Sequence, residues 1–252
     1  MPMSPADLLL VGGAGVVAGA VNAVAGGGTL VSFPALLAVG LTPITANITS
    51  SVGLLSGYAG GSVAYRRELE GQRGRVRGLA PFAVAGGIAG ALLLLVTPES
   101  AFEAVVPYLV LLSCVLLAAQ PRLARALARQ QHGSADLHWG VRAAVGVGGV
   151  YGSYFGAGLG VLLLAVLGML VADELQRLNA LKGVLSLLVN TVGVAVYLIS
   201  GHVAWTYAVL LAVTAYVGGT LGVSVARRLP ASVMRAAVVT LGAVVGVVLL
   251  VT

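Results

Sequence analysis

The sequence predicts an all-α polytopic membrane protein made of two inverted-topology repeats, each a glycine-broken re-entrant helical hairpin plus three transmembrane helices. Three observations lead to this fold class: the composition, an internal repeat and the distribution of basic residues. Of 252 residues, 59% are hydrophobic and only 9% are charged, and the mean hydropathy is +1.03. Such values lie outside the range of soluble domains, so the chain is expected in a cell membrane as a multi-pass protein.

Apolar stretches of about the 20 residues that a spanning helix needs recur along the chain. The N-terminal run lacks the basic region of a signal peptide, and its apolar character continues past any plausible cleavage point. We therefore interpret this run as a membrane element that is retained. The uninterrupted stretches that follow the two glycine-rich regions are 44–65, 79–96, 103–119, 177–200, 204–226 and 233–251.

An internal repeat appears when the chain is shifted against itself by 132 positions. The shift aligns two glycine-rich segments, 25–30 and 157–162, and two membrane asparagines, Asn47 and Asn179. We predict two copies of one unit within a single membrane domain. The first repeat is 1–125, a cytoplasmic linker is 126–137 and the second repeat is 138–252.

Loop charge predicts that the two repeats have opposite orientations. Segment 65–77 carries five arginines, whereas its counterpart 197–206 carries none. The contrast reverses further along, since 97–103 has no basic residue and its counterpart 229–235 ends in Arg235. Lys and Arg near helix ends remain on the cytoplasmic side, so corresponding loops are expected on opposite sides of the membrane.

Inversion requires an odd number of crossings per repeat, yet each repeat contains four apolar segments. The count is resolved if 6–41 and 140–172 are re-entrant hairpins that enter and leave on the same side. All 14 Lys and Arg residues then fall on the cytoplasmic side. Eight ordinary crossings, with the N-terminus inside, would instead leave several outside, namely Arg177, Lys182, Arg227, Arg228 and Arg235.

The glycines explain where each hairpin would break. A glycine inside a helix costs about 1 kcal/mol relative to alanine, and a break in lipid exposes unpaired backbone groups, so it persists only inside protein or beside a polar cavity. Free amides and the positive end of a half-helix attract anions. Two inverted hairpins would bring such tips together near the bilayer midplane. By contrast, glycines at four-residue spacing favour close helix packing; these are Gly86, Gly90, Gly218 and Gly222.

Lys182 is the one charged side chain among the polar residues near the predicted tips, and it takes the place of Ser50 in the repeat. It either contacts substrate, extends to the cytoplasmic interface, or pairs with Asp173 or Glu174. Asn47 and Asn179 likewise either join helices or contribute to one site. The predicted substrate-binding residues are Asn22, Gly26, Gly27, Gly28, Thr29, Asn47, Thr49, Ser50, Ser51, Ser153, Tyr154, Gly156, Gly158, Gly160, Asn179, Lys182, Ser186 and Asn190.

The segment Ala18–Ser50, with its glycine-rich start, proline and Ala-Asn-x-Thr-Ser ending, resembles the TauE/SafE family of sulfite exporters and sulfonate-type permeases. Segment 152–167 echoes it, and the resemblance covers nearly the whole chain. It implies a bacterial inner-membrane carrier of small sulfur-containing anions. Gly26–Gly28, Asn47 and Thr49 match motif positions, whereas Leu159, Val166 and Lys182 depart from the pattern in the second copy.

The sequence thus predicts a secondary transporter or exporter of a small anion: sulfite, a sulfonate, or a related sulfur-containing or organic oxyanion. Access to a site between the hairpin tips would alternate between the two sides. An anion channel and a non-transporting membrane scaffold are the alternatives. An enzyme is not expected, because no histidine is predicted at membrane depth beside Ser153. Expected partners are the anion, membrane lipid, a coupling ion (H⁺ or Na⁺) and a second copy of the chain, with no cofactor, metal or nucleic acid.

Overall fold

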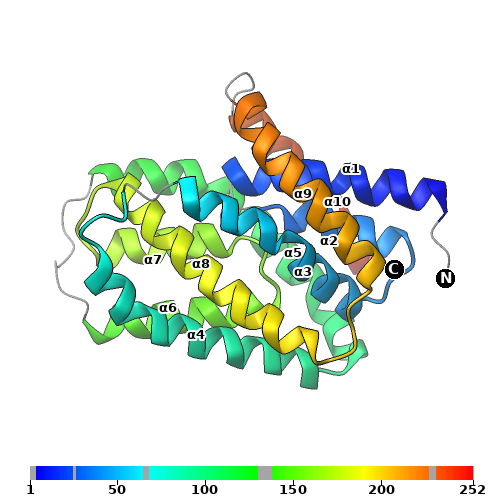
Figure 1. The fold of residues 1–252 in the computed structure, drawn as a ribbon, viewed down its shortest axis with the longest axis horizontal. Coiled ribbons are helices and arrows are strands. Elements are labelled where there is room, and N and C mark those ends of the chain that lie inside the picture. Colours follow the sequence, from blue (N-terminus) through cyan, green and yellow to red (C-terminus); the bar gives the residue numbers. More distant parts are fainter. Residues whose placement is uncertain (1–3, 25–26, 65–67, 130–137, 227–230, 252) are drawn as a thin grey trace.

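The computed structural model describes residues 4–24, 27–64, 68–129, 138–226 and 231–251, which form ten helices and no β-strand (Figure 1). The all-helical fold class is confirmed. The helices are α1 Pro5–Val24, α2 Thr29–Ala38, α3 Pro43–Ala64, α4 Arg73–Val96, α5 Glu99–Arg129, α6 Trp139–Tyr154, α7 Leu159–Leu170, α8 Leu175–Leu198, α9 Trp205–Ala226 and α10 Ala231–Val251.

The long helices match the predicted spans, with two differences. Helix α4 begins at Arg73, six residues before the predicted start, and α5 continues to Arg129, into the predicted linker. The α5 extension consists largely of Arg, Leu and Ala, which are strong helix formers and continue the helix beyond the apolar stretch. The α4 extension alternates three arginines with Gly74, Val76 and Gly78, so helix propensity alone does not account for it. Within the described residues, α1, α4, α5 and α8 are long and apolar enough to cross a membrane.

Helices α2 and α7 are much shorter, with 10 and 12 residues. At 1.5 Å per residue they rise about 15 and 18 Å, roughly half of a hydrocarbon core of about 30 Å. Each follows a longer helix, α1 or α6, after a break of only four residues. In Figure 1, α1 runs from the N-terminus toward the middle of the molecule.

Helix packing has a regular pattern. Each half contains five helices, so the first helix of one half, α1, corresponds to the first of the other, α6, and so on to α5 and α10. Corresponding helices have corresponding packing partners. Helix α1 packs on α9 as α6 packs on α4, and α3 packs on α9 as α8 packs on α4. The remaining large contacts join counterparts directly, since α5 packs on α10 and α3 on α8. The two halves are therefore interleaved, because the largest interfaces all join one half to the other.

The two ends of the bundle differ in charge. The beginnings of α4, α6 and α8 lie at the end opposite the N-terminus in Figure 1, and we call this the basic end because arginines occupy these helix starts. At the other end, the Ile44 amide donates to the Glu99 carboxylate at 3.0 Å. The basic-end arginines in the described part of the chain are Arg73, Arg75, Arg77, Arg142 and Arg177, with Arg122 and Arg125 on the last turns of α5.

Glycines set the distance between the most closely packed helices. A Cβ atom on Gly86 would lie 2.1 Å from the carbonyl oxygen of Gly146, and one on Gly90 would lie 2.1 Å from that of Val150. On the other helix pair, a Cβ on Gly218 would lie 2.0 Å from the Val16 oxygen. The predicted close-packing role of these three glycines is confirmed. The fourth, Gly222, lies outside the residues whose surroundings the structure describes.

Substitution Gly90→Ala is expected to lower the free energy of unfolding by about 1–3 kcal/mol, because α4 and α6 must separate to admit the methyl group. Gly13→Ala is the matched control, since nothing lies within 4 Å of its Cβ position. It should leave stability unchanged or raise it by up to about 1 kcal/mol. Thermal unfolding of the detergent-solubilised wild type and the two variants checks both expectations. If Gly90→Ala melts at the same temperature as wild type, the close contact between α4 and α6 is contradicted.

Candidate functional site

The first helix break lies between α1 and α2, and its described part is Gly27 and Gly28. The Asn22 side chain, near the end of α1, accepts a hydrogen bond from the Gly28 amide through Oδ1 at 2.8 Å. A Cβ on Gly28 would lie 2.4 Å from the Ala18 carbonyl oxygen, so only glycine fits there. The break is thus fixed by Asn22, and Thr29 begins the next helix as a buried residue. Gly26 lies outside the described residues.

The second break, between α6 and α7, depends on two left-handed glycines. Gly156 has φ +83° and Gly158 has φ +80°, conformations that side chains other than glycine rarely adopt. Between them, the Ala157 carbonyl accepts hydrogen bonds from Ser113 Oγ at 2.9 Å and from the Tyr151 hydroxyl at 2.7 Å. The loop therefore turns its carbonyl toward α5 and α6.

The two breaks lie close together. The Phe33 and Phe155 rings pack edge to face with centroids 5.6 Å apart, which joins α2 to the second break. A Cβ on Gly156 would lie 4.0 Å from Thr29 Oγ1. Residues that are more than 120 positions apart in the chain thus meet at one place.

Helix α3 contributes Asn47 to this region. Asn47 is fully buried, and its Nδ2 donates to the Tyr154 carbonyl at the end of α6, at 2.9 Å. Ser50 shares a 2.6 Å hydrogen bond with Ser32 of α2. Both contacts attach α3 to the ends of the half-helices.

Three other predicted residues form structural contacts instead of pointing at the breaks. Thr49 Oγ1 accepts the Ala204 amide at 3.1 Å, before α9. Ser51 Oγ donates to the Asn47 carbonyl in its own helix. The Tyr154 hydroxyl lies 3.5 Å from Thr97 Oγ1, so the Tyr154 backbone carbonyl, rather than its ring, faces Asn47.

Helix α8 carries a stripe of polar residues that begins with Asn179 and Lys182. Lys182 Nζ donates to Asn179 Oδ1 at 3.3 Å. A Cβ on Gly160 would lie 3.8 Å from Lys182 Nζ, which places the ammonium group beside the first turn of α7. Within the described residues, no carboxylate lies within ion-pair distance of Lys182, so it pairs with neither Asp173 nor Glu174.

The stripe continues with Ser186 and Asn190, which are both buried. Asn190 Nδ2 donates to the Ser186 carbonyl at 2.8 Å. Ser153, on α6, donates through Oγ to the Val189 carbonyl at 3.1 Å, and its own carbonyl accepts from the Tyr197 hydroxyl. These bonds join α6 to α8 along the polar stripe.

Several buried polar groups near the breaks have no hydrogen-bond partner among the described residues. They are Asn22 Nδ2, a donor, Asn47 Oδ1, an acceptor, and Ser186 Oγ, which can be either. The amides of Ala157, Gly158 and Gly160 also donate to no group in the described part of the chain. Other buried side-chain atoms without a partner in the described residues lie at the basic end, on Glu68, Gln72 and Arg142. Unpaired buried polar groups are costly, and those at the helix breaks are groups that a polar ligand could pair.

Sequence reasoning missed Ser32, Ser113 and Tyr151, which hold the breaks in place. The sequence did contain a signal for Ser113, because it places this hydroxyl among the apolar residues in the middle of α5, where a buried hydroxyl needs a hydrogen-bond partner. Its bonds to the Tyr151 hydroxyl, at 2.8 Å, and to Ala157 depend on how α5 packs on the second hairpin. No spacing in the sequence gives that contact.

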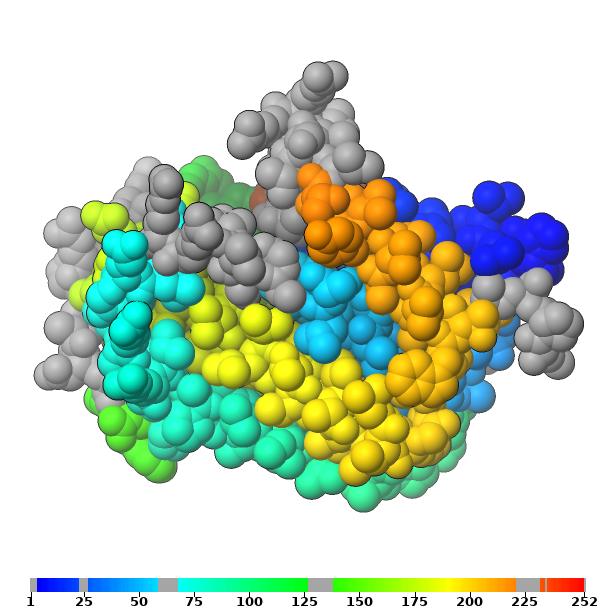
Figure 2. All heavy atoms as spheres, viewed as in Figure 1, coloured from blue at the N-terminus to red at the C-terminus, as the bar shows by residue number. Residues whose placement is uncertain are grey.

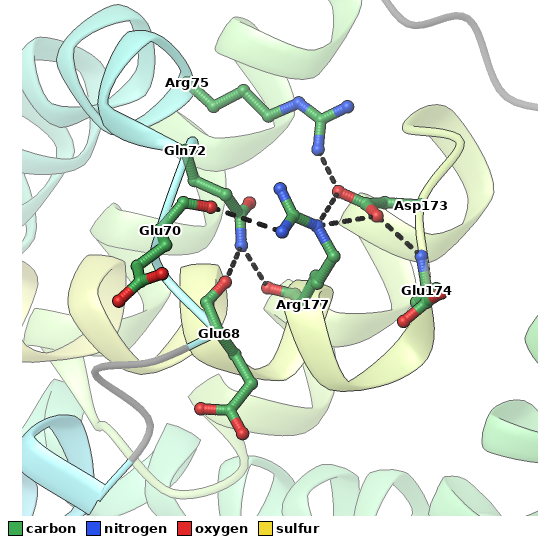
Figure 3. A network of polar contacts seen from close by, with 7 residues as sticks. All are labelled: Glu68, Glu70, Gln72, Arg75, Asp173, Glu174 and Arg177. Carbon is green, nitrogen blue, oxygen red and sulfur yellow. Dashed lines mark hydrogen bonds and ion pairs between the residues drawn. The ribbon is translucent and has the colours of Figure 1, made fainter.

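The basic end holds a separate polar network, shown in Figure 3. The Asp173 carboxylate, between α7 and α8, forms ion pairs with Arg75 of α4 and, at 3.0 Å, with Arg177 of α8. Gln72 Nε2 donates to the carbonyls of Glu68, at 2.8 Å, and Arg177, at 2.9 Å. The network therefore joins the beginning of α4 to the beginning of α8.

The ionisation of Asp173 follows from these contacts. Partial burial alone would raise the pKa of its carboxyl group. The hydrogen bonds that the carboxylate accepts from the Glu174 amide and from both arginines, together with the charge of Arg177, outweigh that effect and lower the pKa below its ordinary value. Asp173 is thus held in its charged form.

A bundle of apolar helices with unpaired polar groups at two buried helix breaks is the architecture of a multi-pass membrane transporter. The chain belongs to the TauE/SafE family, because the family model described as sulfite exporter TauE/SafE matches residues 11–249. This finding confirms the resemblance seen in the sequence. The family is one of membrane transporters rather than of enzymes.

Curated relatives carry names of the same kind. The chain is 23% identical to the probable membrane transporter protein ORF9 of a Sinorhizobium species, over 88% of this chain and 84% of that protein. It is 24% identical to a probable membrane transporter protein of Haemophilus influenzae, over 89% and 87% of the two chains. The chain is also 24% identical to the probable membrane transporter protein YfcA of Escherichia coli, over 93% of this chain and 86% of that protein. No solved structure matches the chain significantly.

Replacing Asp173 with Asn should lower the melting temperature at neutral pH, because hydrogen bonds to charged groups contribute about 1.5–3 kcal/mol. A carboxyl group with a lowered pKa stabilises the fold above its ordinary pKa of about 3.9 and loses that contribution as pH falls through the lowered value. The difference between wild type and Asp173→Asn should therefore shrink below about pH 4. Glu174→Gln, at an exposed side chain, is the control. A difference that is independent of pH would contradict the ionic origin.

Proposed function

We propose that the protein is a secondary transporter of a small oxyanion, with sulfite or a sulfonate as the leading substrate class, and that the anion binds between the two helix breaks. One observation carries the proposal: Lys182 lies beside the first turn of α7 with no carboxylate to neutralise it in the described residues. A cation inside a helical bundle needs a partner, and a transported anion supplies one.

The beginning of α7 supports an anion rather than a cation. Its preceding amides, those of Ala157 and Gly158, are unpaired, and so is that of Gly160 within its first turn. Aligned amides give a helix N-terminus a partial positive charge, and they donate hydrogen bonds to anions. An ammonium group and free amides together offer an oxyanion both charge and direction.

The first break supplies a further donor. Asn22 uses Oδ1 to accept the Gly28 amide, which leaves Nδ2 with its hydrogens directed away from that bond and without a partner. A sulfite or sulfonate group has three oxygens, so it can accept hydrogen bonds from both breaks at once. The Asn22 donor beside the first break and the Lys182 cation beside the second would then hold the anion between them.

Two inverted repeats account for the arrangement of the helices. The exchange of packing partners between α1–α5 and α6–α10 supports two equivalent units, 1–125 and 138–252. The short α2 and α7 support re-entrant hairpins, because neither is long enough to cross the membrane alone. The arginines at the basic end support a cytoplasmic location for that end, by the positive-inside rule.

Alternating access follows from this arrangement. The anion site lies where the two half-helices meet, and the interfaces around it join one repeat to the other. Movement of one hairpin or repeat against the other would expose the site first to one side and then to the other. An anion channel is the alternative, and saturation of the transport rate separates the two.

Purified wild-type protein in liposomes should move sulfite or a short sulfonate with a saturable rate, in a panel that includes sulfate, thiosulfate and carboxylates. Lys182→Met keeps the length of the side chain but removes its charge, and it should reduce that rate about tenfold or more. Arg125→Gln removes an exposed cation at the basic end and should retain the wild-type rate. An unchanged rate in Lys182→Met would refute the site; conductance that never saturates would favour a channel.

Asn22→Asp tests the first break separately. The new carboxylate can still accept the Gly28 amide, so the break and the melting temperature should be preserved. The donor at Nδ2 becomes a negative oxygen that repels an anion, and transport should fall about tenfold or more. Equilibrium binding of the same anion, measured by titration calorimetry, should fall in parallel. Normal binding in a folded Asn22→Asp protein would place the anion elsewhere.

A further inference from the structure

A groove on the outer surface of the basic end lies apart from the proposed anion site. It has a volume of about 450 Å³ and lies between the segment before α4, the first turns of α4, and α8. Figure 2 shows the face on which the beginning of α4, in cyan, lies beside α8, in yellow. The lining residues are Leu69, Glu70, Arg73, Val76, Arg77 and Val184.

The charged side chains of the groove form no ion pair with any other described residue. Arg73 and Arg77 are exposed, lie one turn apart on α4, and have no ion-pair partner in the described part of the chain. The Glu70 carboxylate is also exposed and has no ion-pair partner among the described residues, where the Glu70 backbone carbonyl accepts a hydrogen bond from Arg177 at 3.2 Å. The groove therefore presents two guanidinium groups and one carboxylate that no described residue neutralises.

The walls between these charges are apolar. Leu69 and Val76 flank Arg73, and Val184 lies nine residues into α8, about 14 Å along the helix from its first residue. The groove thus joins a charged region at the start of α4 to an apolar wall farther along the span. A ligand with a charged head and an apolar tail matches this gradient.

The groove and the anion site occupy different faces of α8. Val184 and Lys182 are two residues apart, which corresponds to about 200° around a helix, so their side chains point in nearly opposite directions. Lys182 lies beside Gly160 of α7, whereas Val184 lies on the groove with residues of α4. Occupation of the groove does not require the anion site.

We propose that this groove binds the headgroup of a phospholipid that carries both a phosphate and a primary ammonium group, that is, phosphatidylethanolamine. Arg73 and Arg77 bind the phosphate, as arginines at a membrane surface bind lipid phosphates. Glu70 accepts hydrogen bonds from the ammonium group, and the acyl chain lies along Val184. The carboxylate decides between headgroups, because it repels a purely anionic lipid and cannot accept a hydrogen bond from a quaternary amine.

The test is lipid binding to the delipidated full-length protein in detergent, followed by native mass spectrometry. The probes are phosphatidylethanolamine, phosphatidylcholine and phosphatidylglycerol with identical acyl chains. Wild type should bind phosphatidylethanolamine most tightly. The double variant Arg73→Gln/Arg77→Gln should weaken that binding about tenfold. Glu70→Gln should remove the preference over phosphatidylcholine, and it leaves the backbone bond to Arg177 in place.

The matched control is Arg122→Gln/Arg125→Gln, which removes two arginines from the same end but outside the groove. It should bind phosphatidylethanolamine as wild type does. An equal loss in the control would overturn the proposal, because the effect would then reflect total charge. Equal or tighter binding of phosphatidylglycerol by wild type, or an unchanged preference in Glu70→Gln, would also overturn it. Anion transport is not part of this readout, so the lipid site and the transport function stand or fall separately.

Discussion

The structure depends on one constraint: wherever a helix stops inside the bundle, its backbone polar groups must find partners away from water. The chain stops twice in this way, and each stop is supported by side chains from elsewhere. Asn22 binds the Gly28 amide, whereas Ser113 and Tyr151 bind the Ala157 carbonyl. Asn47 binds the Tyr154 carbonyl at the end of α6. The interleaved packing follows, because helices from both halves must surround each break.

The support is incomplete in a particular way. Amides at the beginning of α7 and the Asn22 Nδ2 group have no acceptor in the described residues, and Asn47 Oδ1 is the unpaired acceptor beside them. An excess of donors beside an unneutralised Lys182 favours a negatively charged ligand over a positive one. The two breaks are also chemically different, since Lys182 takes the place that Ser50 has in the first half. Ser50 is already bonded to Ser32. The second half would therefore contribute charge and the first half neutral donors.

Much of the fold could be predicted from the sequence, because apolar length and glycine position act locally. The expected spans 177–200 and 204–226 correspond to α8 at 175–198 and α9 at 205–226. The 132-residue offset also indicated which helices would be counterparts. The site was harder to predict. The sequence pattern does not predict the hydrogen bonds between Thr49 and Ala204 or between Ser113 and Ala157, because both depend on how separate helices pack. Polar residues near a predicted break were correctly located along the chain, but their hydrogen-bond partners were not.

Helix α8 connects the separate parts of the molecule. Its beginning is attached to α4 through Asp173, Arg177 and Gln72; one face carries Lys182 toward α7, and the opposite face carries Val184 toward the surface groove. Because a helix is nearly rigid over these two turns, displacement of α8 relative to α4 would change the groove and the surroundings of Lys182 together. The ionic network lies where α4 and α8 begin, so it restrains that displacement at one end only. At the other end, neutral hydrogen bonds hold α8 and the connection that follows it: the Tyr197 hydroxyl donates to the Ser153 carbonyl of α6, and the Ala204 amide donates to Thr49 of α3. In the described residues, ion pairs thus join α4 and α8 where these helices begin, whereas neutral hydrogen bonds join the end of α8 and its connection to α6 and α3.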